Sequence, residues 1–67
     1  MITIVLNGQS RTCAAGHTLA ALLEDAGYAQ RRVAVEINRE IVPKSEHAQR
    51  EIHDGDRIEI VHALGGG

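Results

Sequence analysis

The chain has 67 residues, enough for one small domain, and 43% of them are hydrophobic although Tyr28 is the only aromatic side chain. This composition indicates a single folded unit with an aliphatic core and argues against a disordered chain. The formal charge is −2 and the basic residues are spread along the chain, so the sequence lacks the concentrated basic face of most nucleic-acid-binding proteins.

The sequence also indicates where the protein works. Cys13 is the only cysteine, which rules out an internal disulfide and fits a reducing compartment. Met1 leads directly into a strand pattern, without the basic leader of a signal peptide. No apolar run approaches the ~20 residues that a membrane-spanning helix needs. We therefore expect a cytoplasmic protein that does not insert into a membrane.

The first element is predicted to be a β-hairpin. Ile2, Ile4 and Leu6 alternate with other residues at the period of a strand with one buried face. The dipeptide Asn7-Gly8 follows, and this pair is the strongest short signal for a hairpin turn. The return strand is expected over residues 10–14.

A helix is predicted next, because the apolar period changes from 2 to 3.6. The positions that form its apolar stripe are Leu19, Leu22, Leu23 and Ala26. Thr18 is placed to cap the N-terminus. Gly27 fits the left-handed position just past the end, from which Tyr28 can fold back on Leu23.

The second half of the chain returns to strands. Residues 33–37 alternate, a turn at 38–39 leads into a short strand over 40–42, and Pro43 ends it. The segment that follows is polar and irregular, with at most one helical turn. A tight turn at 53–56 then leads into a last strand over 57–64. The predicted order is β-β-α-β-β-β, a two-layer α+β domain over residues 1–64 with a flexible glycine tail at 65–67.

The side chains offer little catalytic chemistry. The histidines lack the spacing that brings metal ligands together, and His17, His47 and His53 are expected to be solvated. His62 is interpreted as a sheet-end residue that reaches solvent, with a partner surface as the alternative. Cys13 has no His or Asp nearby in sequence and is expected to be a half-buried strand residue. The chain also has no phosphate-binding glycine loop, so we expect no catalytic residue, no metal and no bound cofactor.

The sequence ends on three glycines, Gly65, Gly66 and Gly67. Glycine is the costliest residue to order, so these residues are expected to be mobile in the free protein. They could be a frayed end. Alternatively, a peptide without side chains could thread a narrow channel into the active site of another protein, where its terminal carboxylate reacts.

The stretch "VAVEINREIVPKSEHAQREIHDGDRIEIVHALGGG", together with the Asn7-Gly8 hairpin and the leucine-rich helix, resembles the ThiS family, the sulfur carrier proteins of thiamine biosynthesis. The resemblance extends over the whole chain, and its specificity comes from the combination of these segments with the chain length. It implies a ubiquitin-like β-grasp fold, in which a mixed sheet wraps around one helix. The family pattern requires a terminal glycine pair, matched here by Gly66 and Gly67, with Gly65 as an addition that lengthens the tail.

The resemblance also implies a mechanism. In this family a ubiquitin-activating-like adenylyltransferase uses ATP to convert the terminal carboxylate, here that of Gly67, into an adenylate. Sulfur from a cysteine desulfurase relay, or from another donor, displaces AMP and leaves a thiocarboxylate. Thiazole synthase then consumes that sulfur. The carrier is thus a protein co-substrate rather than an enzyme, and with no residue after Gly67 we expect no proteolytic maturation.

Strand alternation further predicts a surface for these partners. If the isoleucines face the helix, then Val5, Ala34, Val61 and Ala63 face outward. If the first and last strands are neighbours, Val5, Val61 and Ala63 form an apolar patch at the start of the tail. With Ala34 and Leu64 this patch is the candidate partner-binding surface. The alternative is that these are ordinary small apolar residues on the outer face of a sheet.

Other functions stay open at this point. The small subunit of molybdopterin synthase shares the fold and the glycine end, but it is usually longer and often has an aromatic residue where this chain has Ala63-Leu64. Other sulfur carriers, a protein that is conjugated to targets through its C-terminus, and a non-covalent ubiquitin-like binding module are further alternatives. Deletion of Gly67 separates a carrier, which would lose function, from a binding module, which would not.

Overall fold

The computed structural model describes residues 1–62, and within them the predicted order of elements is confirmed. The elements are β1 (Ile2–Leu6), β2 (Gln9–Cys13), α1 (Leu19–Asp25), β3 (Val33–Ile37), β4 (Glu40–Val42), the 3₁₀ turn η1 (Lys44–Glu46) and β5 (Arg57–His62). The return strand of the hairpin is one residue earlier than predicted. Positions 63 and 64 of the predicted last strand lie outside the described residues.

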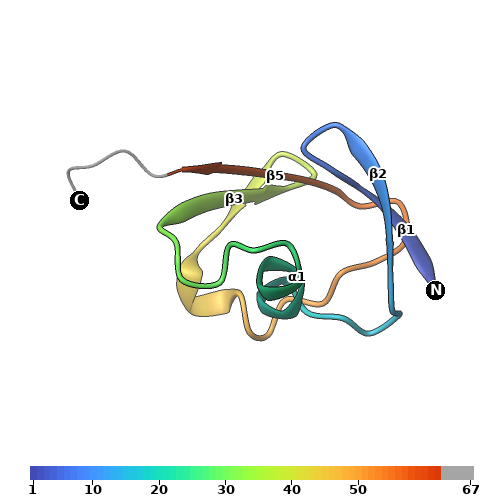
Figure 1. The fold of residues 1–67 in the computed structure, drawn as a ribbon, viewed down its shortest axis with the longest axis horizontal. Coiled ribbons are helices and arrows are strands. Elements are labelled where there is room, and N and C mark those ends of the chain that lie inside the picture. The colour runs from blue at the N-terminus through green and yellow to red at the C-terminus, as the bar shows by residue number, and fades with distance from the viewer. Residues whose placement is uncertain (63–67) are drawn as a thin grey trace.

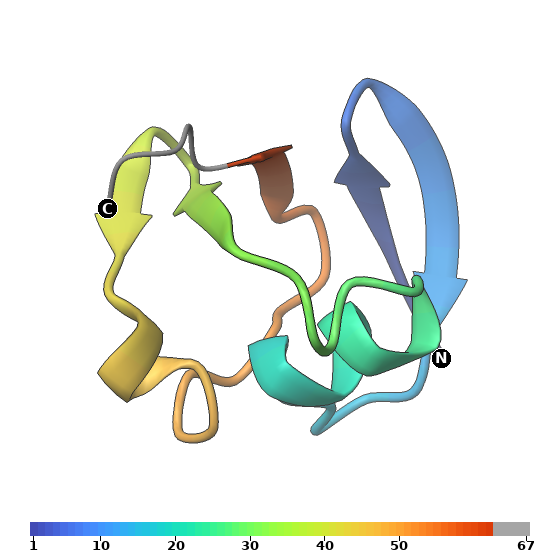
Figure 2. The same ribbon diagram turned by 60° about the vertical axis from the view of Figure 1, so that its left-hand side comes forward.

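The five strands form one mixed sheet in the order β2-β1-β5-β3-β4. The central pair, β1 and β5, is parallel, and the other neighbouring pairs are antiparallel. The helix α1 lies across one face of this sheet (Figures 1 and 2). This arrangement is the two-layer α+β domain that the residue pattern predicted and the β-grasp fold that the family resemblance implied.

The Asn7-Gly8 turn joins the first hairpin to the last strand. Both residues have positive φ, 50° for Asn7 and 84° for Gly8, as a two-residue hairpin turn requires. The side-chain Oδ1 of Asn7 accepts a hydrogen bond from the backbone N–H of Ile60 at 2.7 Å, and the backbone N–H of Asn7 donates to the carbonyl of Ile58 at 2.9 Å. The turn therefore also fixes how β5 lies beside β1.

The helix has the caps that the sequence predicted. The Oγ1 of Thr18 accepts a hydrogen bond from the backbone N–H of Ala21 at 3.2 Å. Gly27 has φ 90°, and the backbone N–H of Tyr28 donates to the carbonyl of Leu23 at 2.7 Å, which closes the helix end. A helix of seven residues is too short to persist alone, so its stability depends on packing against the sheet.

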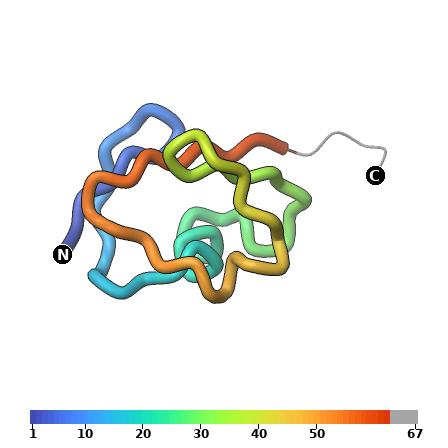
Figure 3. Tube along the Cα trace, turned by 180° about the vertical axis from the view of Figure 1, so that it is seen from behind, coloured from blue at the N-terminus to red at the C-terminus, as the bar shows by residue number. Residues whose placement is uncertain are grey.

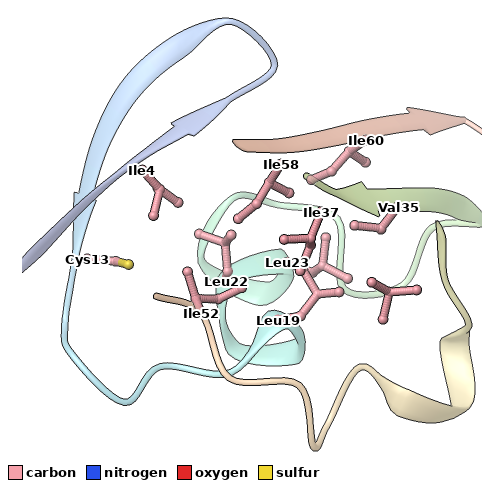
Figure 4. Packing of buried hydrophobic residues seen from close by; sticks show 11 residues of the cluster. Ile4, Cys13, Leu19, Leu22, Leu23, Val35, Ile37, Ile52, Ile58 and Ile60 are labelled. Atoms are coloured by element: carbon pink, nitrogen blue, oxygen red, sulfur yellow. The ribbon is translucent and has the colours of Figure 1, made fainter. Parts of the chain in front are cut away.

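The core fills the space between the helix and the sheet (Figure 4). Its buried hydrophobic residues are Ile4, Cys13, Leu19, Leu22, Leu23, Val35, Ile37, Val42, Ile52, Ile58 and Ile60. The core is aliphatic apart from the thiol, as composition indicated. Cys13 is more deeply buried than the half-buried position expected for it.

Residues 44–52 are more ordered than their polar sequence suggested. Ile52 is only 1% exposed, and its backbone N–H donates to the carbonyl of His17. His47 was expected to be solvated, and that expectation is wrong, because its side chain is 8% exposed and its ring Nε2–H donates to the carbonyl of Val42 at 2.9 Å. The reason is that η1 turns the chain back toward β4. From behind, the segment passes alongside the helix (Figure 3).

Candidate functional site

The candidate site is the C-terminal end of β5, the strand that leads toward the glycines. This strand lies between β1 and β3 in the middle of the sheet. Its last residue, His62, is paired with Val33 of β3. Gly65, Gly66 and Gly67, as well as Ala63 and Leu64 of the predicted partner surface, lie outside the described residues, so their predicted roles stay predictions.

The end of β5 is also held by a ring contact. The rings of His62 and Tyr28 have centroids 6.2 Å apart and are tilted by 48°. His62 is exposed, in agreement with its interpretation as a sheet-end residue. Its contact with the loop after α1 was not predicted, since no local signal brings residues 28 and 62 together. The described chain thus ends at a well-anchored point.

An exposed apolar surface covers the outer face of the sheet next to this end. Val61 is 62% exposed and is paired across the strands with Ala34, which is also exposed. Ile41 of β4 is 74% exposed and lies diagonally across from Ala34, because it is paired with Glu36. We call these three residues, Ala34, Val61 and Ile41, the outer patch.

The structure corrects the predicted partner surface at two residues, Val5 and Ile41. The first and last strands are neighbours, as assumed, but the register pairs Val5 with Arg57 at the start of β5. Val5 therefore does not adjoin Val61, and the prediction that the two share one patch at the start of the tail is wrong. Ile41 was missed, although the alternation of residues 40–42 around the buried Val42 was a usable signal for an outward side chain.

Carboxylates lie beside the outer patch. Glu36 and Glu59 are directly opposite each other on β3 and β5. Like charges in this arrangement destabilise a sheet. The stability of the sheet therefore does not explain why Glu36 and Glu59 face each other.

The thiol of Cys13 is a weak candidate for chemistry. Burial raises the pKa of the Cys13 thiol above its ordinary value, although the positive charge of Arg11 opposes the shift. A raised pKa leaves less of the nucleophilic thiolate at neutral pH. Within residues 1–62, no three His, Cys, Asp or Glu side chains lie close enough together to hold a metal ion. Nor does this part of the chain contain a helix long and apolar enough to span a membrane.

Comparison with known proteins places the chain in a family. The sequence model of the ThiS family matches residues 4–67, a range that includes all three glycines. The sulfur carrier protein ThiS of Escherichia coli K12 is 41% identical over 64 residues, which cover 96% of this chain and 97% of that protein.

A second kind of relative is much longer. The thiazole synthase of Paramagnetospirillum magneticum is 52% identical over 64 residues, which cover 96% of this chain but only 20% of that protein. A thiazole synthase of Magnetococcus marinus also matches over 20% of its length. This chain therefore spans about a fifth of these two relatives.

The solved structures agree with the sequence matches. The crystal structure of the thiamine biosynthesis protein ThiS from Geobacter metallireducens superposes with a TM-score of 0.86 at 29% identity, over 98% of this chain and 100% of that one. Fold, helix and sheet arrangement, and sequence thus point to the same group of proteins. The chain belongs to the ThiS family.

Proposed function

We propose that this chain, a ThiS-family sulfur carrier of thiamine biosynthesis, carries its sulfur as a thiocarboxylate on Gly67. The observation that carries this proposal is the family match, which runs through residue 67 and so includes the terminal glycines. The anchored end of β5 adds a physical reason, because it gives a partner a fixed surface from which to take up the residues that follow.

The first step activates the carboxylate. One carboxylate oxygen of Gly67 attacks the α-phosphorus of ATP held by a ubiquitin-activating-like adenylyltransferase, and pyrophosphate leaves. The product is a glycyl-adenylate, in which AMP replaces oxide as the leaving group. ATP is thus bound by the partner enzyme, and the chain itself needs no cofactor.

The second step brings in sulfur. The terminal sulfur of a persulfide, supplied by a cysteine desulfurase relay, attacks the carbonyl carbon, and AMP leaves with the bonding electron pair. A thiol then attacks the other sulfur of the resulting acyl disulfide, so the thiocarboxylate departs and a new disulfide forms on the donor side. Gly65 and Gly66 help by lacking side chains that would clash in a narrow channel.

The acceptor is thiazole synthase. The two thiazole synthases that contain a region similar to this chain support this assignment, since one polypeptide there combines both parts. The chain acts as a co-substrate that is loaded, discharged and used again. We assign the outer patch, with the predicted residues Ala63 and Leu64 that follow β5, as the docking surface for the activating partner.

Reconstitution with purified partners tests this function. Thiazole synthase and its other substrates, the adenylyltransferase, ATP, cysteine and a cysteine desulfurase are combined with the full chain or with a variant that lacks both Gly66 and Gly67. We expect thiazole phosphate to form only with the full chain. If ATP is withheld after the chain has been loaded, the amount of product should not exceed the amount of chain. Equal product with the shortened variant would contradict the proposal and favour a non-covalent binding module.

A further inference from the structure

A second surface, which is basic where the outer patch is apolar, lies beside the end of β5. It is a hollow of about 320 Å³ between the loop after α1 and η1. Its lining includes the apolar side chains of Leu23, Tyr28 and Val33 and the basic side chains of Arg31, Arg32 and Lys44. We call this hollow the basic groove. Figures 1 and 3 show that the loop and η1 lie at the same end of the molecule as the last residues of β5.

The charge of the groove differs from that of the whole chain. The protein has a net charge of −2 and only seven Lys and Arg residues, yet three of them line this one hollow. Among the described residues that line it, there is no Asp or Glu, and Glu24 lines only the adjoining hollow. Arg31 and Lys44 are exposed, and neither takes part in the ion pairs His17–Asp25 and His53–Glu51. The groove therefore attracts a negatively charged group.

The floor of the groove is apolar and firmly held. Leu23 belongs to the buried core, and Tyr28 and Val33 are partly buried against it. The backbone bond from Tyr28 to Leu23 and the strand pairing of Val33 fix both sides of the floor. A preformed hollow with an apolar floor and charged edges suits a ligand that combines an apolar side chain with a carboxylate.

The position of the groove selects its occupant. Val33 is paired with His62, and the ring of Tyr28 contacts that of His62, so the groove adjoins the last residue that the structure describes. A protein that takes Gly67 into its active site must approach this end of the molecule. This step rests on the proposed function, and thiazole synthase is chosen over the activating enzyme because two thiazole synthases contain a region similar to this chain.

We propose that the basic groove binds an acidic segment of thiazole synthase, with an apolar side chain against Leu23 and Val33 and a carboxylate between Arg31 and Lys44. The outer patch is apolar, with Glu36 and Glu59 beside it, and suits a different partner surface. A basic groove and a separate apolar patch near the end of β5 allow the carrier to distinguish the protein that loads it from the protein that unloads it.

Charge reversal at the groove tests the proposal. The variants Arg31→Glu and Lys44→Glu are compared with Arg39→Glu, which makes the same change in net charge at the β3–β4 turn, at the other end of β3 from Val33. Binding of each full-length chain to purified thiazole synthase is measured by calorimetry. We expect each groove variant to raise Kd about fivefold or more and the control to stay within about twofold. The Kd of the unaltered chain should also rise with salt concentration, because salt screens the charges of the groove. The Kd of each groove variant should rise less steeply.

The outcomes separate this proposal from the proposed function. Equal Kd values for all three variants and the unaltered chain, with Gly67 still loaded with sulfur, would overturn the groove proposal alone. A chain that neither accepts sulfur nor binds thiazole synthase would overturn both. Shifts of the Arg31 and Tyr28 nuclear magnetic resonance signals with inorganic phosphate, but not with thiazole synthase, would assign the groove to a small anion and would also refute the proposal.

Discussion

Single buried polar residues fix the turns on which the last strand depends. Asp56 is 7% exposed, and its two carboxylate oxygens accept hydrogen bonds from the side-chain amide of Asn38 and from the backbone N–H of His53. Asp54, by contrast, is exposed and accepts one bond from the backbone N–H of Thr3. The two carboxylates appear equivalent in the sequence "HDGD", and only the structure separates them.

Asp56→Ala should therefore cost far more than Asp54→Ala. Removal of the Asp56 carboxylate leaves two donors without their partner, and we expect a loss of about 2–3 kcal/mol in the free energy of unfolding. For Asp54→Ala, where water can replace the acceptor, we expect less than about 1 kcal/mol. Urea unfolding of both variants measures the difference, and equal losses would show that Asp56 has no special role.

The thiol of Cys13 gives a prediction about pH. Because burial raises its folded-state pKa, the unfolded chain loses the thiol proton first as the pH rises. The stabilising contribution is complete below the pKa of the unfolded thiol and is lost as the pH rises through the folded pKa. In Cys13→Ala the free energy of unfolding should therefore fall less steeply at alkaline pH than it does in the unaltered chain. The difference between the two unfolding curves across alkaline pH measures it, and parallel curves would contradict it.

At the scale of elements, local signals predicted the hairpin and the helix well. Asn7-Gly8, Thr18 and Gly27 specify turns and caps within a few residues, and the structure uses each of them as predicted. The ordered structure of segment 44–52 was not predicted, because it depends on hydrogen bonds to residues far away in the sequence. The burial of Ile52, for example, follows from its backbone bond to His17 and from the neighbouring bridge between Thr18 and Glu51.

The opposed glutamates of β3 and β5 should cost stability. Glu59→Gln removes the repulsion with Glu36, and we expect a gain of about 0.2–1 kcal/mol in the free energy of unfolding. Glu40→Gln is the matched control, because Glu40 is paired with the apolar Ile37. The gain should shrink in high salt, where exposed charges are screened. A gain of the same size for the control would instead point to a general effect of net charge.

At the scale of the whole molecule, the register of β5 decides where the surfaces lie. The sequence predicted that Ala34 and Val61 face outward, but not that Val5 would pair with Arg57, four residues along β5 from Val61. It gave no signal for the basic groove either, since Arg31 and Lys44 come together only through the packing of η1 near the loop after α1. Pairings between distant segments depend on the complete sheet, and a local pattern cannot specify them.

The outer patch should matter for loading and not for folding. Val61→Asp places a charge on an exposed apolar surface, so we expect sulfur loading by the activating enzyme to slow about tenfold or more, with the thermal midpoint little changed. Thr12→Asp, on the exposed outer face of the edge strand β2, is the control and should load normally. Normal loading of Val61→Asp would exclude the outer patch from this step.

The central claim is that sulfur resides on Gly67, and intact-mass spectrometry with fragmentation tests it most directly. The untagged chain is measured before and after incubation with the adenylyltransferase, ATP, cysteine and a cysteine desulfurase. We predict a gain equal to the replacement of one oxygen atom by sulfur, located by the fragments at Gly67 and absent when Gly66 and Gly67 are both deleted. No gain, with an activating enzyme proven on its own carrier, or a gain located at Cys13 instead, would contradict the account.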